Sequence, residues 1–135
     1  MDTDKNRFEH LLSAEIPSSA LTETIIGCAY TVGNALGCGF LEKVYENALS
    51  IEMRSSGLIV EQQKVIQVRY RNIIVGDYCA DIVVNNCILL ELKAAKAIDE
   101  MHQAQILNYL KATGFKVGLI LNFGTARLGI KRMVL

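Results

Sequence analysis

The stretch that decides the fold of this sequence is Ile88-Leu89-Leu90-Glu91-Leu92-Lys93-Ala94. It is as apolar as the central strand of a β-sheet, yet it carries an acidic and a basic residue two positions apart. Because successive residues of a strand face opposite sides, Glu91 and Lys93 share one face of the sheet. A charge on a covered sheet face is unfavourable unless it is paired or binds a metal ion. The stretch therefore predicts a central strand that carries a candidate functional site.

Patterns on both sides of this stretch define the expected fold. Alternating, β-branched segments with turns at Arg71-Asn72 and Asn85-Asn86 precede it, and a helical segment and two apolar strands follow it. We expect helices at about 18–36, 41–55 and 98–113, and strands at about 60–70, 73–84, 88–94, 116–122 and 127–134. The order α-α-β-β-β-α-β-β predicts an α/β (α+β) fold, in which helices flank a mixed β-sheet.

Residues 1–17 are predicted to form an N-terminal extension, with a short helix around Phe8 to Leu12. Residues 18–135 are predicted to form a single domain, because no linker or repeat interrupts them. Ser18 or Ser19 is the expected N-cap of the first long helix. The second helix is expected to bury a stripe at helical spacing: Leu41, Val44, Tyr45, Ala48 and Ile51.

A second acidic residue, Asp81, lies on the strand before the central one. A two-residue loop at Asn85-Asn86 would place Asp81 opposite Leu90, on the wrong face of the sheet. A three-residue loop that includes Cys87, or a β-bulge, would place Asp81 opposite Glu91 instead. Two carboxylates on one face repel each other, so the second register calls for a cation. Oxygen ligands without histidine or cysteine favour Mg²⁺ or Mn²⁺.

The same pattern also has a purely structural interpretation. An E-x-K pair on a half-buried strand is often a solvated surface ion pair that contributes less than about 1 kcal/mol. In that case the chain would be an ordinary structural domain, and Glu91 and Lys93 would have no catalytic role. The apolar residues on either side of the pair favour the functional interpretation.

Composition narrows the classes of function. Fourteen basic residues balance fourteen acidic ones, whereas a non-specific nucleic-acid binder usually carries a basic excess. The four cysteines have no C-x-x-C spacing, so a zinc site is not expected. The N-terminal segment is polar, and no stretch is long and apolar enough to span a bilayer. We therefore expect a cytoplasmic protein without a membrane partner.

Several ordered blocks of the sequence resemble a known family. The pattern D-x(9)-E-x-K at Asp81, Glu91 and Lys93 resembles the PD-(D/E)XK nuclease superfamily, with Ala80 where its name has proline. The chain is most similar to the small GxxExxY proteins of that superfamily, whose naming motif stands here as Gly39-Phe40-Leu41-Glu42-Lys43-Val44-Tyr45. Similar blocks at 25–27, 80–84, 90–94, 104–114 and 121–132 extend the resemblance over nearly the whole chain.

The resemblance implies a restriction-endonuclease-like fold and a metal-dependent nuclease that hydrolyses phosphodiester bonds of nucleic acid, with DNA as the expected substrate. It implies that Asp81 and Glu91 bind Mg²⁺ (or Mn²⁺), helped by the carbonyl of Leu92. Lys93 would position the attacking water and stabilise the transition state. Glu42 would add a further catalytic acid; its structural alternative is a first-turn acid that interacts with the helix dipole.

Gln105 and Tyr109 lie four residues apart on the third predicted helix and share a face. They resemble the Q-x-x-x-Y element of RecB-like members, which implies a substrate-binding role at the border of the site. Equally, Tyr109 could be a core aromatic and Gln105 a surface group. Two functions stay open: an active nuclease, which could act as a homodimer, and a catalytically inactive nuclease-fold module for nucleic-acid or protein binding.

Overall fold

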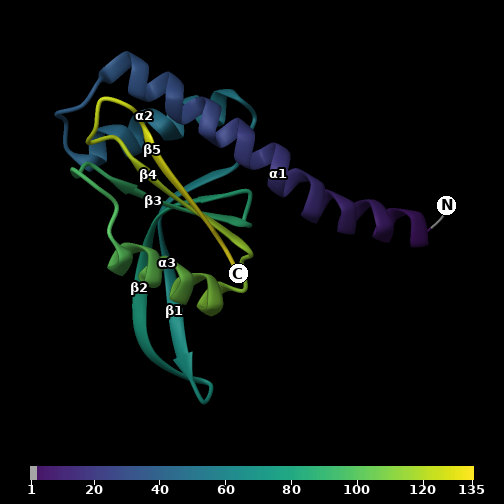
Figure 1. The fold of residues 1–135 in the computed structure, drawn as a ribbon. Helices are drawn as coiled ribbons and strands as arrows, with labels where there is room; N and C mark the ends of the chain where they lie inside the picture. Colours follow the sequence, from purple (N-terminus) through teal and green to yellow (C-terminus); the bar gives the residue numbers. More distant parts are fainter. Residues whose placement is uncertain (1–2) are drawn as a thin grey trace.

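The computed structural model describes the backbone of residues 3–135 and the side chains of residues 19–135. In this part of the chain, three helices and five strands form the fold (Figure 1). They are α1 Thr3–Leu36, α2 Glu42–Ser55, β1 Val60–Tyr70, β2 Ile73–Val84, β3 Ile88–Lys93, α3 Glu100–Thr113, β4 Val117–Asn122 and β5 Gly129–Val134. The order and the types of element confirm the predicted α+β fold and its mixed sheet.

The five strands form one sheet in the order β1-β2-β3-β4-β5. Neighbouring strands are antiparallel except β3 and β4, which are parallel and are connected by α3. Figure 1 shows α1 and α2 above one face of the sheet and α3 below the other. The central strand β3 is therefore covered on both faces, which explains its nearly continuous apolar sequence.

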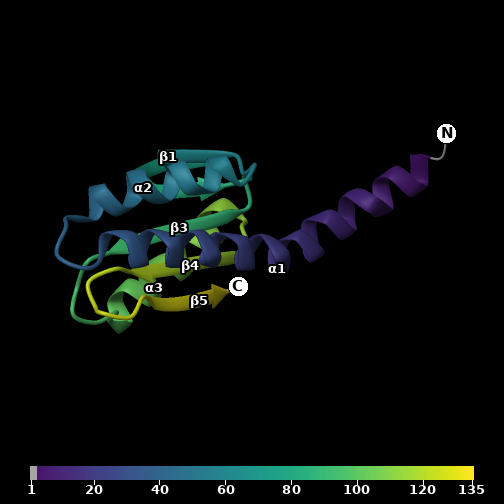
Figure 2. The ribbon, with the colours of Figure 1, turned by 90° about the horizontal axis from the view of Figure 1, so that it is seen from above.

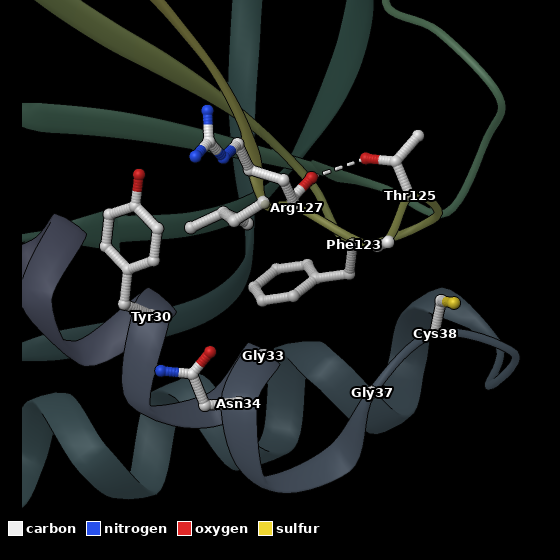
Figure 3. A pocket seen from close by; sticks show the side chains of 10 residues that line it. Tyr30, Gly33, Asn34, Gly37, Cys38, Phe123, Thr125 and Arg127 are labelled. Carbon is white, nitrogen blue, oxygen red and sulfur yellow. Dashed lines mark hydrogen bonds between the residues drawn. The ribbon is translucent and has the colours of Figure 1, made fainter.

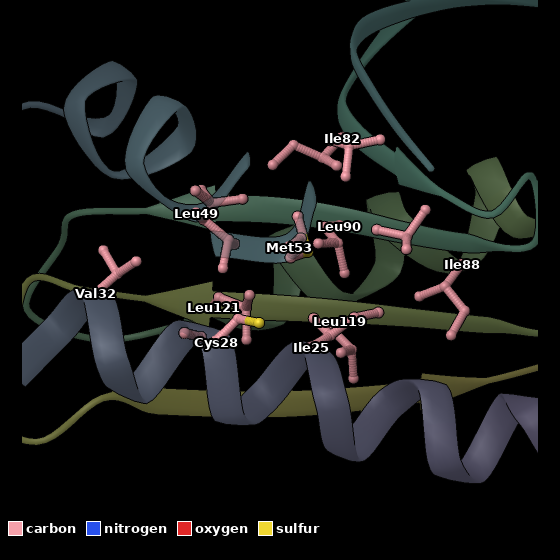
Figure 4. Packing of buried hydrophobic residues seen from close by; sticks show 14 of the residues in the cluster. Ile25, Cys28, Val32, Leu49, Met53, Ile82, Ile88, Leu90, Leu119 and Leu121 are labelled. Atoms are coloured by element: carbon pink, nitrogen blue, oxygen red, sulfur yellow. The ribbon is translucent and has the colours of Figure 1, made fainter. Parts of the chain in front are cut away.

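Two hydrophobic layers hold this arrangement together. Between the sheet and helices α1 and α2, side chains of both helices interdigitate with those of the strands (Figure 4). Their largest fully buried members include Ile25, Leu49, Met53, Ile82, Ile88, Leu90 and Leu119. A smaller layer lies beneath α3 and includes Leu89, Ile106, Leu110 and Ile120. Burial of such side chains contributes about 1.5–3 kcal/mol each, so the two most buried strands, β3 and β4, are held strongly.

Helix α1 differs from the prediction at its N-terminal end. It begins at Thr3 and continues through Pro17, rather than starting at a cap on Ser18 or Ser19. The short helix predicted around Phe8 to Leu12 is part of this longer element. A proline inside a helix removes one intrahelical hydrogen bond and disfavours helical backbone at the residue before it, so the continuation through Pro17 carries an energetic cost. Figures 1 and 2 show the N-terminal part of α1 extending away from the sheet.

Helix α2 buries only part of the predicted stripe: Tyr45 and, in part, Ala48 are buried as predicted, but the rest of the stripe is not. Leu41 and Ile51 are exposed, at 81% and 65%, whereas Tyr45, Leu49 and Met53 are fully buried. The buried face also includes Glu46 and Ser50. The helix is rotated about its axis relative to the prediction. The side chains of Tyr45, Leu49 and Met53, which are spaced four residues apart, pack against the sheet. This rotation turns an acidic residue inward, where the sequence pattern gave no reason to expect one.

No helix among the described residues is both long enough and apolar enough to cross a membrane.

Candidate active site

The loop between β2 and β3 has the three-residue length that favours a site. Val84 pairs with Ile88 and Ile82 with Leu90, so the loop consists of residues 85–87. Asn85 and Asn86 both adopt left-handed backbone conformations, at φ 50° and 53°, which asparagine tolerates. The ladder ends at Ile82 and Leu90; continued by one position, this register would set Asp81 opposite Glu91.

Strand β2 separates from β3 at this position, and Asp81 bridges the gap. The ladder between the two strands ends at Ile82 and Leu90, whereas β3 stays paired with β4 as far as Lys93. The backbone N–H of Leu92, left without a strand partner on the β2 side, donates a hydrogen bond to Asp81 Oδ2 at 2.8 Å. The site therefore forms where the sheet opens into a fork.

A break in strand alternation coincides with this fork. Ile82 contributes to the layer under α1 and α2, whereas Ala80, two residues earlier, contributes to the layer beneath α3. Residues two apart on a regular strand would share a face. On the neighbouring strand, Gln63 is the unpaired residue between two regular pairs, and its φ is +52°. Left-handed backbone at a non-glycine residue is uncommon and clusters at functional sites.

Alternation along β3 puts the charged pair on the α3 side of the sheet. Leu90 and Leu92 belong to the layer under α1 and α2, and Leu89 belongs to the layer beneath α3. Glu91 and Lys93 therefore share the side of Leu89, as predicted from the sequence. Both side chains are half-buried, so neither is a freely solvated surface group.

Burial perturbs both acidic groups. It is the largest influence on Glu91 and raises its pKa to about 7, with further repulsion from Glu42 and Glu46. Burial also raises the pKa of Asp81, and repulsion from Glu46 adds to this effect. Opposing contributions come from the Leu92 N–H, which lowers the pKa of Asp81, and from Lys93, which lowers both values. The Lys93 ammonium therefore acts on both carboxylates, which is the relationship that an E-x-K site requires.

The acidic pair fits a hard divalent cation. Glu91 Oε1 is buried and has no hydrogen-bond partner, and Asp81 uses only Oδ2 to accept the Leu92 N–H. Among the residues that the structure describes, no three His, Cys, Asp or Glu side chains gather as a metal-binding group. The available donors are therefore two carboxylates, to which backbone carbonyls and water would be added. Mg²⁺ commonly binds proteins in this way, retaining several waters.

Glu46 is a site residue that the sequence analysis missed. Its side chain is 5% exposed, and its charge raises the pKa of both Asp81 and Glu91. Its Oε1 accepts a hydrogen bond from Gln63 Nε2 at 2.6 Å, and its Oε2 accepts from Gln62 Nε2 at 2.6 Å. Lys43 forms an ion pair with Oε2 at 3.0 Å. The i+4 spacing from Glu42 was the signal in the sequence that could have identified it.

Gln63 connects this buried acid to the fork. Its side-chain amide donates to Glu46 Oε1 and also interacts with Asp81, whose pKa it lowers. Glu42, one helical turn before Glu46, lies in the first turn of α2 and raises the pKa of Glu91. Electrostatic and hydrogen-bond interactions thus connect four of the predicted residues, Asp81, Glu91, Lys93 and Glu42, with Glu46 and Gln63, although no three of these described acidic groups gather closely enough to form a metal-binding group.

The loop after Lys93 is held by Asn122, a buried residue at the end of β4. Asn122 Oδ1 accepts hydrogen bonds from the N–H groups of Ala95 and Gly124, both at 3.0 Å, and its Nδ2 donates to the Ala95 carbonyl at 2.9 Å. A Cβ on Gly124 would lie 2.4 Å from Ala95 backbone atoms. This close packing fixes the chain directly beyond β3.

Gln105 and Tyr109 lie apart from these contacts. Gln105 is exposed on α3. Tyr109 is half-buried and stacks on Tyr78 of β2 with an angle of 7° between the ring planes, as part of the layer beneath α3. This packing matches the structural interpretation of Tyr109 as a core aromatic. Tyr78 Oη is buried without a hydrogen-bond partner in the described structure.

Comparison with known proteins gives a family. The structure named "Crystal structure of SSO0001" is similar at 16% sequence identity with a TM-score of 0.49, and the match covers 90% of this chain and 61% of that chain. No curated protein matches the sequence. A family model described as the PD-(D/E)XK nuclease superfamily matches residues 19–133. Because that match covers most of the sequence, this chain belongs to the PD-(D/E)XK nuclease superfamily.

Proposed function

We propose that this protein is a metal-dependent nuclease that hydrolyses phosphodiester bonds of nucleic acid, with DNA as its substrate, through a domain of residues 18–135. Membership of the superfamily supports a nuclease in general. The single observation that carries the proposal is the buried, unpartnered Glu91 Oε1 at the fork beside Asp81. The Gly39–Tyr45 motif further supports assignment to the GxxExxY proteins.

In this proposal Asp81 and Glu91 hold Mg²⁺ or Mn²⁺, which, when bound, would lower the pKa of a water molecule and neutralise phosphate charge. Asp81 is pre-positioned because one of its oxygens is fixed by the Leu92 N–H. A buried pair of carboxylates with raised pKa values binds a cation in preference to remaining charged without one. Glu42 and Glu46 add negative potential that attracts the cation.

Lys93 has two roles in the reaction. Its ammonium donates a hydrogen bond that orients the attacking water, and it stabilises the negative charge that develops on the phosphate oxygens. The attacking water gives up a proton and its oxygen forms a bond to phosphorus, while the bond from phosphorus to the departing sugar oxygen breaks and that oxygen takes up a proton. The products are a phosphomonoester end and a hydroxyl end.

Cleavage of labelled single- and double-stranded DNA and RNA in the presence of Mg²⁺ or Mn²⁺ tests this proposal. Activity should disappear with EDTA and in Lys93→Ala, whereas Lys116→Ala, which removes an exposed lysine beyond the site, should retain it. Equal residual activity in wild type and Lys93→Ala would identify a contaminating nuclease and overturn the assignment.

A non-catalytic nuclease-fold module is the second candidate. The neutral net charge and the lack of a three-ligand group among the described residues favour it. Titration calorimetry with Mn²⁺ separates the two candidates, since the nuclease must bind the ion in an Asp81- and Glu91-dependent manner. A folded wild-type protein that does not bind Mn²⁺ would favour the module.

A further inference from the structure

A pocket of about 250 Å³ lies between the end of α1 and the loop that connects β4 to β5 (Figure 3). One wall is the α1 face that carries Tyr30, Gly33 and Asn34, and the buried ring of Phe123 lies between this wall and Arg127. None of the roles discussed so far uses these residues. The volume suits one ring-sized ligand group rather than a peptide or a duplex.

The polar groups of the pocket are available for a ligand. Among the described residues, the Tyr30 hydroxyl, the Asn34 amide and the Arg127 guanidinium form no hydrogen bond or ion pair with another residue. The lining contains one cation and no acidic residue. The Thr125 hydroxyl donates to the Arg127 carbonyl at 2.6 Å, which holds the loop that presents the guanidinium.

Close packing does not require a glycine at position 33, but the missing side chain keeps the pocket open. A glycine inside a helix is about 1 kcal/mol less favourable than alanine. A Cβ at Gly33 would meet only the Phe123 ring, at 3.8 Å, which is an ordinary contact distance. The fold would therefore accept alanine here, and the missing side chain leaves room beside Phe123.

The pocket is joined directly to the catalytic strand. The Phe123 N–H donates to the Lys93 carbonyl at 2.8 Å, and the Phe123 ring stacks on Tyr45 of α2, with centroids 4.6 Å apart. Gly37 and Cys38, which also line the pocket, begin the short segment that leads to Glu42. The pocket is therefore connected through the chain both to Lys93 and to Glu42.

We propose that this pocket binds one unpaired nucleotide of the nucleic-acid strand that the catalytic centre cuts, with the base against the exposed Tyr30 ring, the base edge at Asn34 and a phosphate at Arg127. This inference rests on the proposed nuclease function. It implies that the substrate has an unpaired segment beside the cleavage site. Aromatic faces and an arginine are the groups that bind single-stranded nucleic acid without sequence selection. A base within a duplex would first have to leave its stack.

The test measures binding of a short single-stranded oligonucleotide that carries 2-aminopurine, by fluorescence in EDTA, so that binding is observed without cleavage. Arg127→Ala and Tyr30→Leu should each weaken binding roughly ten-fold, whereas Tyr30→Phe keeps the ring and stays near wild type. Lys116→Ala removes a cation at the other end of β4 and should leave binding unchanged.

Gly33→Ala is expected to fold, so a loss of binding in this variant would not result from unfolding. It should narrow the pocket and weaken binding roughly ten-fold, while its thermal midpoint is no lower than that of the wild type. The matched control is Gly27→Ala on the same helix, where a Cβ would meet nothing within 4 Å. Wild-type affinity in Gly33→Ala, Tyr30→Leu and Arg127→Ala would overturn the pocket proposal.

The two proposals fail in different ways. If the protein binds the oligonucleotide through the pocket but cleaves no nucleic acid, the proposal of a nucleotide site stands and the proposal of nuclease activity is wrong. If the pocket variants keep both wild-type metal-dependent cleavage and wild-type binding by fluorescence, the proposal of nuclease activity stands and the proposal of a nucleotide site is wrong.

Discussion

Asp81 accepts a hydrogen bond at 2.8 Å from the backbone N–H of Leu92, at the position where β2 leaves β3. A side-chain carboxylate thereby replaces the carbonyl that a continuing strand would have provided. This relationship gives Asp81 a structural role in addition to its proposed metal-binding role, and substitutions can separate the two.

Asp81→Asn should abolish cleavage but leave stability close to that of the wild type, because the amide oxygen can still accept the Leu92 N–H. Asp81→Ala should abolish cleavage and also lower the free energy of unfolding by about 1–2 kcal/mol, because the half-buried N–H loses its partner. Urea denaturation beside a cleavage assay checks both variants. Equal stability of the two would show that the hydrogen bond contributes little.

The pH dependence of stability should report Glu91. Burial raises its pKa from 4.5 to about 7, so between these values the folded state binds a proton that the unfolded state has released. Stability is therefore greatest below about pH 4.5 with respect to this group and falls as the pH rises through 7, by about 2–3 kcal/mol. The raised pKa of Asp81 acts in the same direction.

Glu91→Gln should remove most of this slope and make the protein more stable than the wild type at pH 8 in EDTA. Mg²⁺ or Mn²⁺ should stabilise the wild type at pH 8 and have no effect on the variant. Urea midpoints between pH 4.5 and pH 8, with and without the ion, provide the measurement. A variant with the same slope as the wild type would assign the titration to another group.

Glu46→Gln should weaken divalent-ion binding by a few-fold, about 0.5–1 kcal/mol, because it removes a buried charge that acts on both Asp81 and Glu91. The amide retains the size of the side chain, so the contacts with Gln62 and Gln63 are only partly lost. Glu52→Gln, on the same helix but outside these contacts, serves as the control. Calorimetry with Mn²⁺ compares the two, and identical affinities would exclude Glu46 from the site.

Gly124→Ala should destabilise the protein by about 2 kcal/mol or more and reduce cleavage. Its Cβ would lie 2.4 Å from Ala95 backbone atoms, so the loop after Lys93 must move. Gly27→Ala, where the new methyl group meets nothing, should instead stabilise α1 by about 0.5–1 kcal/mol. Thermal denaturation distinguishes these opposite signs, and a neutral Gly124→Ala would show that the loop adapts freely.

Much of the fold follows from local patterns. The bounds of β1 and β2 match the prediction, and Glu91 and Lys93 share a face because strand alternation requires it. The chain alone left two registers for Asp81, since an asparagine turn can have either length. The paired residues Val84 and Ile88 decide for the three-residue loop.

Only the tertiary structure decided which side chains surround the acidic pair. Glu46 is buried because α2 packs on the sheet through the row that starts at Tyr45, and a helical pattern with two possible apolar rows does not reveal that choice. Gln63 takes a left-handed backbone conformation where both strands lose their alternation, which no local propensity predicts. Periodicity determines which residues share a face; the packing of one element on another determines which faces meet.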